Sequence, residues 1–175
     1  MNTQNLYKEG EPVPLHLSSG FVVTFKSTLF NLTKGSAPQS TTLNLFNQNT
    51  DIILCIVFRT GKKKIFYSDY SFNPLQGGWG KERSTDLDVD QVQHRGATIL
   101  VYNFLTDSKI NRYQILVNGT TVCYFDSRFS GPVTQMRYWG EQGTRKPILS
   151  NPLEVVCCPI LDLPPEEQRA IQLGR

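Results

Sequence analysis

The chain has 175 residues and a mass of 19.8 kDa, a length typical of one domain or of one domain with an appendage. Hydrophobic residues make up 39% and aromatic residues 11%, and aromatic rings bury enough area to exclude a disordered chain. The net charge of +3 is too mild to indicate a nucleic-acid partner by itself. Residues 1–11 are polar, and no run of about 18 apolar residues follows. We therefore expect no membrane insertion, and a protein that is cytoplasmic or exported without a leader.

Short segments rich in β-branched and aromatic residues recur along the chain between clusters of Gly, Pro, Asn, Asp and Ser. This pattern predicts an all-β sandwich. The clearest predicted strands cover residues 20–26, 41–46, 52–59, 64–69, 97–104, 113–118, 121–126 and 153–157.

Two hairpins can be read from the turn chemistry. Alternation places Tyr113, Ile115 and Val117 on one face of their strand, which we expect to face the core. The dipeptide Asn118-Gly119 follows and predicts a type I′ turn to the next strand. Residues 60–63 predict a second hairpin, with lysines at its tip.

Helical periodicity first occurs near the C-terminus, where residues 163–174 predict one short helix. Proline and acidic residues suit its first turn, and Gly174 can end it. We therefore expect a sandwich domain over residues 1–158 and a tail over residues 159–175. A helix this short either docks on the sandwich or a partner, or frays.

Glycines surround Trp79 in the stretch 76–83, and the charged residues Glu82 and Arg83 follow. An exposed indole beside glycine can meet the C–H face of a sugar ring, while charged side chains bind its hydroxyl groups. A buried tryptophan in a loop is the alternative interpretation.

Other chemistries have weaker support. The four cysteines are expected to be free thiols, and Cys157-Cys158 lacks the spacing of a zinc site, so we expect no metal and no cofactor. The lysines of residues 62–64 are better explained by a charged hairpin tip than by a nucleic-acid surface. A glycosidase would need Glu82 and an aspartate between residues 86 and 90 as a pair, but those aspartates look like a solvated loop.

The order of these features resembles the galectin family, and more closely its fungal branch. The resemblance spans roughly residues 20–158 and is carried by the stretches 43–46, 51–59, 65–68, 79–82 and 112–118. It implies a sandwich of two antiparallel sheets with a shallow sugar groove on one face, and a lectin that binds glycans without catalysis. It also implies a homo-oligomer, because multivalency strengthens weak groove sites.

The resemblance assigns a sugar-binding role to three matching residues, Arg59, Trp79 and Glu82. The positions of the family's His, Asn and second Arg fall here on Cys55, Ser68 and Ser84. A thiol is a weak hydrogen-bond donor, so we expect weakened β-galactoside selectivity and, by analogy with fungal relatives, glycans that contain N-acetylglucosamine.

Two further candidate contacts are less closely matched to the family. Arg83 lies one position before the expected arginine, and Gln39 lies in a loop from which fungal members use an amide. A galectin-type protein without sugar binding, acting through protein contacts, remains the alternative function.

Overall fold

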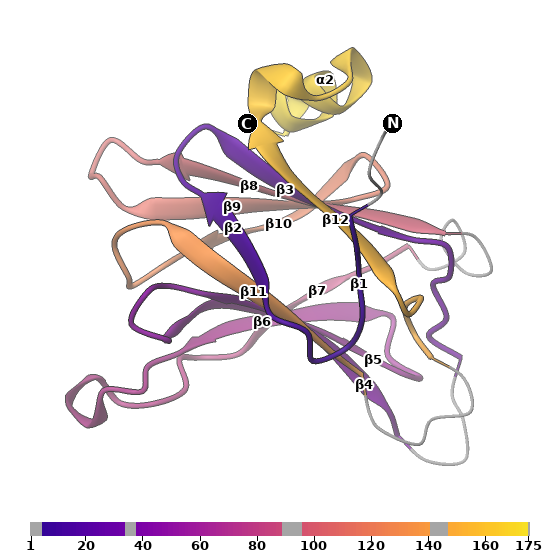
Figure 1. The fold of residues 1–175 in the computed structure, drawn as a ribbon, viewed down its shortest axis with the longest axis horizontal. Coiled ribbons are helices and arrows are strands. Elements are labelled where there is room, and N and C mark those ends of the chain that lie inside the picture. The colour runs from indigo at the N-terminus through magenta and orange to yellow at the C-terminus, as the bar shows by residue number, and fades with distance from the viewer. Residues whose placement is uncertain (1–4, 34–37, 89–95, 141–146, 175) are drawn as a thin grey trace.

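The computed structural model describes residues 5–33, 38–88, 96–140 and 147–174, in which twelve strands form two antiparallel six-stranded sheets packed as a sandwich (Figure 1). Sheet A has the order β1 (Leu6–Tyr7), β12 (Leu153–Pro159), β3 (Phe21–Ser27), β8 (Ala97–Leu105), β9 (Asn111–Val117) and β10 (Thr120–Asp126). Sheet B has the order β2 (Val13–Leu17), β11 (Val133–Gly140), β4 (Ser40–Phe46), β5 (Ile52–Arg59), β6 (Lys64–Tyr70) and β7 (Arg83–Asp86). Two 3₁₀ turns, η1 (Pro74–Gln76) and η2 (Ile160–Asp162), and the helix α2 (Pro165–Leu173) complete the described elements. The predicted all-β sandwich with a short C-terminal helix is confirmed.

The core lies between the two sheets and follows from strand alternation. Leu54, Ile56 and Phe58 of β5 are fully buried there. Across the core, β9 contributes Tyr113 and Ile115, both also fully buried, as its alternation predicts. The intervening residues of β5 therefore face outward from sheet B, which is where the site forms.

Both predicted hairpins are present. Asn118 and Gly119 have φ values of 49° and 80°, the left-handed conformations that a type I′ turn requires, and they join the paired strands β9 and β10. Strands β5 and β6 pair across the second turn, in which Lys62 N donates to Arg59 O at 3.2 Å.

Four strands were not predicted. The two-residue β1 is too short for a pattern, and β2 contains Pro14, which an edge strand tolerates because one side of it needs no ladder hydrogen bond. The polar edge strand β7 carries no hydrophobic signal. Strand β11 has a register shift between Val133 and Gln135, which interrupts its alternation.

The C-terminal helix docks rather than frays. It lies on the outer side of sheet A, away from sheet B (Figure 1). Leu163 and Ile171 are buried against Val22, Leu100 and other apolar residues of that face, and the side-chain amide of Gln114 donates to Ile171 O at 3.1 Å. In the described parts of the chain, no helix combines the length and apolarity needed to cross a membrane.

Candidate functional site

The site begins with the pairing of β5 and β6 in sheet B. Cys55 lies opposite Ser68, and Val57 lies opposite Phe66. Directly opposed residues share a face, so these four side chains and Arg59 occur on the outer face of the sheet. The strand β5 thus presents Cys55, Val57 and Arg59 at alternate positions on that face.

A cavity of about 410 Å³ lies over this face, and we call it the Trp79 cavity. Five of the seven residues singled out from the sequence line it together, namely Cys55, Arg59, Ser68, Trp79 and Glu82. Ser40 and Thr42, from β4, line the same cavity and were not singled out. Their signal was available, since alternation along β4 buries Thr41 and Leu43 and turns Ser40 and Thr42 outward.

Arg59 and Glu82 form a two-point ion pair at the cavity. Arg59 Nη1 donates to Glu82 Oε1 at 3.0 Å and Nη2 donates to Oε2 at 2.7 Å. The guanidinium also lies 4.1 Å from the centre of the Phe66 ring. The hydrogen bonds that Arg59 donates to the Glu82 carboxylate raise the pKa of Arg59, so this group stays charged. The pair therefore places a guanidinium and a carboxylate side by side at the cavity.

Cys55 contributes little polarity to the cavity floor. The residue is buried, and burial is the main reason that its pKa is raised to about 12, with the Glu82 carboxylate adding to the effect. The thiol is thus neutral, and a neutral thiol is a weak donor. Together with Val57 it makes this part of the floor largely apolar.

Trp79 is exposed, which answers the question of whether it belongs to the core. The residue retains 58% of its accessible surface, and its ring meets the Tyr70 ring edge-on with centroids 4.9 Å apart. A Cβ on the next residue, Gly80, would lie 2.1 Å from Asp69 Oδ1, so any other residue there would displace this carboxylate. Gly80 N also donates to Asp69 O at 2.9 Å. This close approach holds the loop after Trp79 against β6.

Arg128, on the loop between β10 and β11, anchors the Trp79 loop from outside. Its Nε lies 3.0 Å from Asp69 Oδ1, Nη1 donates to Gln76 O at 2.7 Å, and Nη2 donates to Gly78 O. Burial raises the pKa of Asp69 and the Arg128 charge opposes that rise. Sequence analysis missed Arg128, since nothing near it in the chain indicates partners some fifty residues away.

The two remaining candidates do not line the Trp79 cavity. Gln39 exchanges hydrogen bonds with Thr60, through Thr60 N to Gln39 O at 2.9 Å and Gln39 N to Thr60 Oγ1 at 3.0 Å. Arg83 lies opposite Tyr67 in β6, so it belongs to the other face of sheet B. Ser84, opposite Phe66, holds the position on the cavity's face.

The residues considered for a glycosidase or a metal site do not come together in the described structure. Asp86 lies 3.5 Å from Lys64 Nζ in an exposed ion pair, Asp88 lines a different cavity from Glu82, and Asp90 falls outside the described residues. The described residues contain no group of three or more His, Cys, Asp or Glu side chains that could hold a metal ion.

Comparison with known proteins gives a consistent result. No protein-family model matches the chain. A curated protein from Cyclocybe aegerita, described as an anti-tumor lectin, is 30% identical over 141 residues, which cover 80% of this chain and 84% of that protein.

The solved structures that share this fold include galectins. Sheep galectin-11, in complex with glycerol, has a TM-score of 0.63 at 17% identity and covers 87% of this chain and 99% of its own. A human galectin-16 variant has a TM-score of 0.64 at 20% identity, covering 89% and 99%. A tetrameric galectin from the ball sponge Cinachyrella has a TM-score of 0.57 at 17% identity, covering 85% and 97%. With the fold, the lectin relative and these structural neighbours, the chain belongs to the galectin family.

Proposed function

We propose that this galectin is a non-enzymatic lectin and that the Trp79 cavity is its sugar-binding site. The observation that carries the proposal is the exposed Trp79 indole beside the Arg59–Glu82 ion pair in one cavity. A flat aromatic face suits the C–H groups of a pyranose ring, and charge-assisted hydrogen bonds to its hydroxyls contribute about 1.5–3 kcal/mol each. Ser68, Ser40 and Thr42 add neutral hydroxyl partners.

The proposed specificity differs from that of an ordinary β-galactoside lectin. Cys55 offers a buried neutral thiol where the family has a histidine, and Ser84 has too short a side chain to replace an arginine. A site that lacks the partner of a particular hydroxyl loses selectivity for it. The apolar floor at Cys55 and Val57 suits the methyl group of an acetamide, so we propose that oligosaccharides of N-acetylglucosamine bind in addition to, or in place of, β-galactosides.

Side-by-side calorimetric titrations with lactose and chitotriose test this proposal. We expect chitotriose to bind at least as tightly as lactose, and Glu82→Gln to weaken both. The chain offers a matched control, because Arg112 and Asp126 form a similar two-point pair on sheet A, away from the cavity. Asp126→Asn should leave both affinities unchanged. Tight binding that is selective for lactose would contradict the specificity, and equal effects of the two variants would contradict the site.

One observation favours a second candidate, a galectin-type protein that has lost sugar binding and acts through protein contacts. The outer face of sheet B carries an apolar cluster of Ile52, Cys55 and Val57, packed with the partly exposed Phe46, Phe66 and Tyr70. Such a face can bind protein as well as sugar. Binding to a glycan array would decide against this alternative, and the absence of any glycan ligand would favour it.

We also propose that the protein works as a homo-oligomer. An open cavity of this kind holds a single sugar weakly, and several copies on one particle raise avidity without new contacts. The ball-sponge neighbour is described as tetrameric. Light scattering of the purified chain tests the assembly, and a monomer at all concentrations would contradict it.

A further inference from the structure

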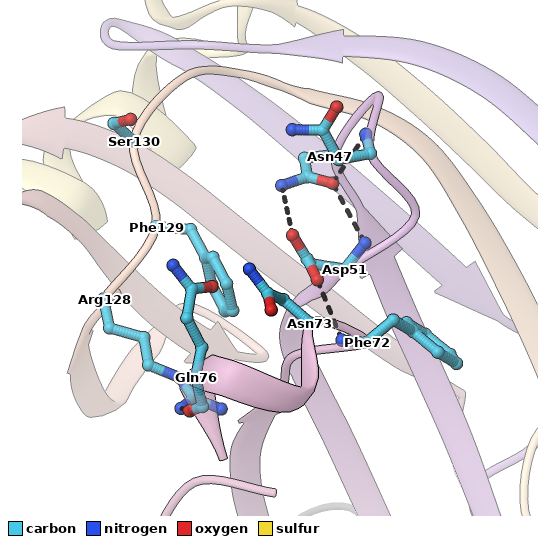
Figure 2. A pocket seen from close by; sticks show the side chains of 9 residues that line it. Asn47, Asp51, Phe72, Asn73, Gln76, Arg128, Phe129 and Ser130 are labelled. Carbon is cyan, nitrogen blue, oxygen red and sulfur yellow. Dashed lines mark hydrogen bonds between the residues drawn. The ribbon is translucent and has the colours of Figure 1, made fainter. Parts of the chain in front are cut away.

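A second pocket, distinct from the Trp79 cavity, lies at one end of the sandwich (Figure 2). It has a volume of about 530 Å³ and is formed by three loops, which join β4 to β5, β6 to β7 and β10 to β11. This volume is within the range of about 300–1,000 Å³ usual for small-molecule sites. We call it the loop pocket.

One wall of the loop pocket carries a buried carboxylate. Asp51 is 9% exposed, and its Oδ1 accepts from Phe72 N at 2.9 Å. Its Oδ2 accepts from Asn47 Nδ2 at 3.3 Å. These two hydrogen bonds engage two of about four lone-pair sites, because the one proton of the Ser71 hydroxyl, 3.4 Å from Oδ1, is given to Gln76 Oε1 at 3.1 Å, which leaves acceptor capacity. Within the described parts of the chain no cation pairs with Asp51, so its charge disfavours an anionic ligand.

Three carboxamides provide the complementary donors. Asn73 Oδ1 accepts from Leu75 N, and Gln76 Oε1 accepts from Ser71 Oγ at 3.1 Å. The NH₂ groups of these two side chains, and the whole side-chain amide of Asn49, have no partner among the described residues. Figure 2 shows Asn73 and Gln76 extending into the space between the loops. The pocket therefore has several uncommitted N–H donors.

The one guanidinium in the wall does not create an anion site. All three nitrogens of Arg128 are engaged, by Asp69, Gln76 O and Gly78 O. The group also lies 5.2 Å from the centre of the Phe129 ring. Arg128 shapes the loop pocket, and its charge is already paired with Asp69.

We propose that the loop pocket is a second saccharide site, which binds a neutral sugar unit. Sugar hydroxyls both donate and accept hydrogen bonds, which matches amide donors beside the Asp51 acceptor. An anion would be repelled by the Asp51 carboxylate, which has no cation beside it in the described residues. A purely apolar ligand would cover the amide groups and leave them without hydrogen-bond partners. The proposal does not depend on the Trp79 cavity. If both sites bind, one chain can bridge two glycans.

Side-chain amide signals in NMR spectra report on this pocket directly. The probes are galactose, mannose, N-acetylglucosamine and glucuronic acid, each titrated at millimolar concentration into the full chain. We expect at least one neutral sugar to shift the NH₂ signals of Asn49, Asn73 and Gln76, in the unaltered protein and equally in Trp79→Ala. Glucuronic acid should bind more weakly.

Asn73→Asp is the decisive variant, because aspartate keeps the acceptor for Leu75 N and removes the NH₂ donor. It should weaken the neutral sugar by about two- to tenfold, the value of one hydrogen bond. Asn31→Asp is the matched control, since Asn31 Oδ1 accepts from Thr33 N in a similar turn elsewhere. Asn49→Leu should behave as Asn73→Asp does.

Three results would overturn the second site. They are no shift of the three amides with any neutral sugar, tighter binding of glucuronic acid than of the neutral sugars, or equal affinity in Asn73→Asp and Asn31→Asp. If the first of these results came with a shift of the Trp79 indole, it would at the same time support the Trp79 cavity.

Discussion

Replacing Arg128 with alanine should weaken the fold and the sugar site together, although Arg128 does not line the Trp79 cavity. The substitution removes the ion pair with Asp69 and frees the carbonyls of Gln76 and Gly78, on either side of the turn that precedes Trp79. The loop then keeps its contact between Gly80 N and Asp69 O, but it loses the anchor on its outer side.

The size of the stability loss follows from the burial of the two partners. Removing one member of a buried ion pair costs about 3–5 kcal/mol, because the other charge is left uncompensated. The Asp69 side chain is 7% exposed, but that of Arg128 is 34% exposed, so water screens part of the interaction. We therefore expect a loss of about 2–3 kcal/mol, or a fall of roughly 4–12 °C in the melting temperature of a domain of this size.

The deficit should grow as the pH rises. Burial already raises the pKa of Asp69 above its ordinary value of 3.8, and Arg128→Ala removes the charge that opposes this shift. An acid whose pKa is raised in the folded state favours folding below its unfolded pKa and loses that contribution as pH rises through the folded pKa. The variant should therefore melt closest to the parent near pH 4 and furthest below it near neutral pH.

Thermal melts across this pH range, combined with calorimetric titration of chitotriose, measure both effects. Freeing the loop should lower the affinity by roughly two- to tenfold, the cost of ordering it on binding. Arg128→Lys is the matched control, because it keeps a charge near Asp69 but cannot bind both carbonyls, so it should retain most of the stability and less of the affinity. Adding Asp69→Asn to Arg128→Ala should recover stability, since no buried charge then remains.

Unchanged melting temperature and unchanged affinity in Arg128→Ala would refute the anchoring role. A deficit that does not vary with pH, or that Asp69→Asn fails to reduce, would refute its assignment to the Asp69 charge.

Three further predictions concern the site and the tail. Trp79→Ala should abolish binding at the Trp79 cavity and change the free energy of unfolding by about 0.5 kcal/mol or less, because the ring is largely exposed. A calorimetric titration and a thermal melt measure the two effects, and a large loss of stability with retained affinity would contradict the site. Cys55→His with Ser84→Arg should strengthen lactose binding in a calorimetric titration, and tight lactose binding by the unaltered chain would show that other residues replace these donors. We propose that the sandwich domain ends near residue 158: truncation after Cys158 should leave it folded but less stable, since Leu163 and Ile171 no longer cover sheet A, with unchanged sugar affinity. Light scattering and a melt test this last prediction, and an insoluble chain would show that the tail is integral to the core.

Local patterns in the sequence were sufficient where short-range physics decides the structure. The turn at Asn118-Gly119 forms because both residues adopt positive φ readily. Period-two alternation in β9 places Tyr113 and Ile115 together on one face, and that face packs in the core between the sheets. The same alternation in β5 places Cys55 and Arg59 on one face, so this half of the Trp79 cavity could be predicted.

The rest of the face that carries the Trp79 cavity, to which β7 and the Trp79 loop contribute, depends on contacts between segments that are distant in the sequence. Whether Arg83 or Ser84 faces the cavity is decided by the register of β7 against β6, because a shift of one residue exchanges the two faces, and a polar edge strand carries no pattern that selects its register. The turn before Trp79 is likewise held by a distant residue, Arg128, which lies about fifty residues later on the loop between β10 and β11 and donates to the carbonyls of Gln76 and Gly78. Every residue has a backbone carbonyl, so the amino-acid sequence of the loop does not show which carbonyls accept a hydrogen bond from a distant side chain. Only the packing of the two sheets brings the Arg128 guanidinium to these carbonyls.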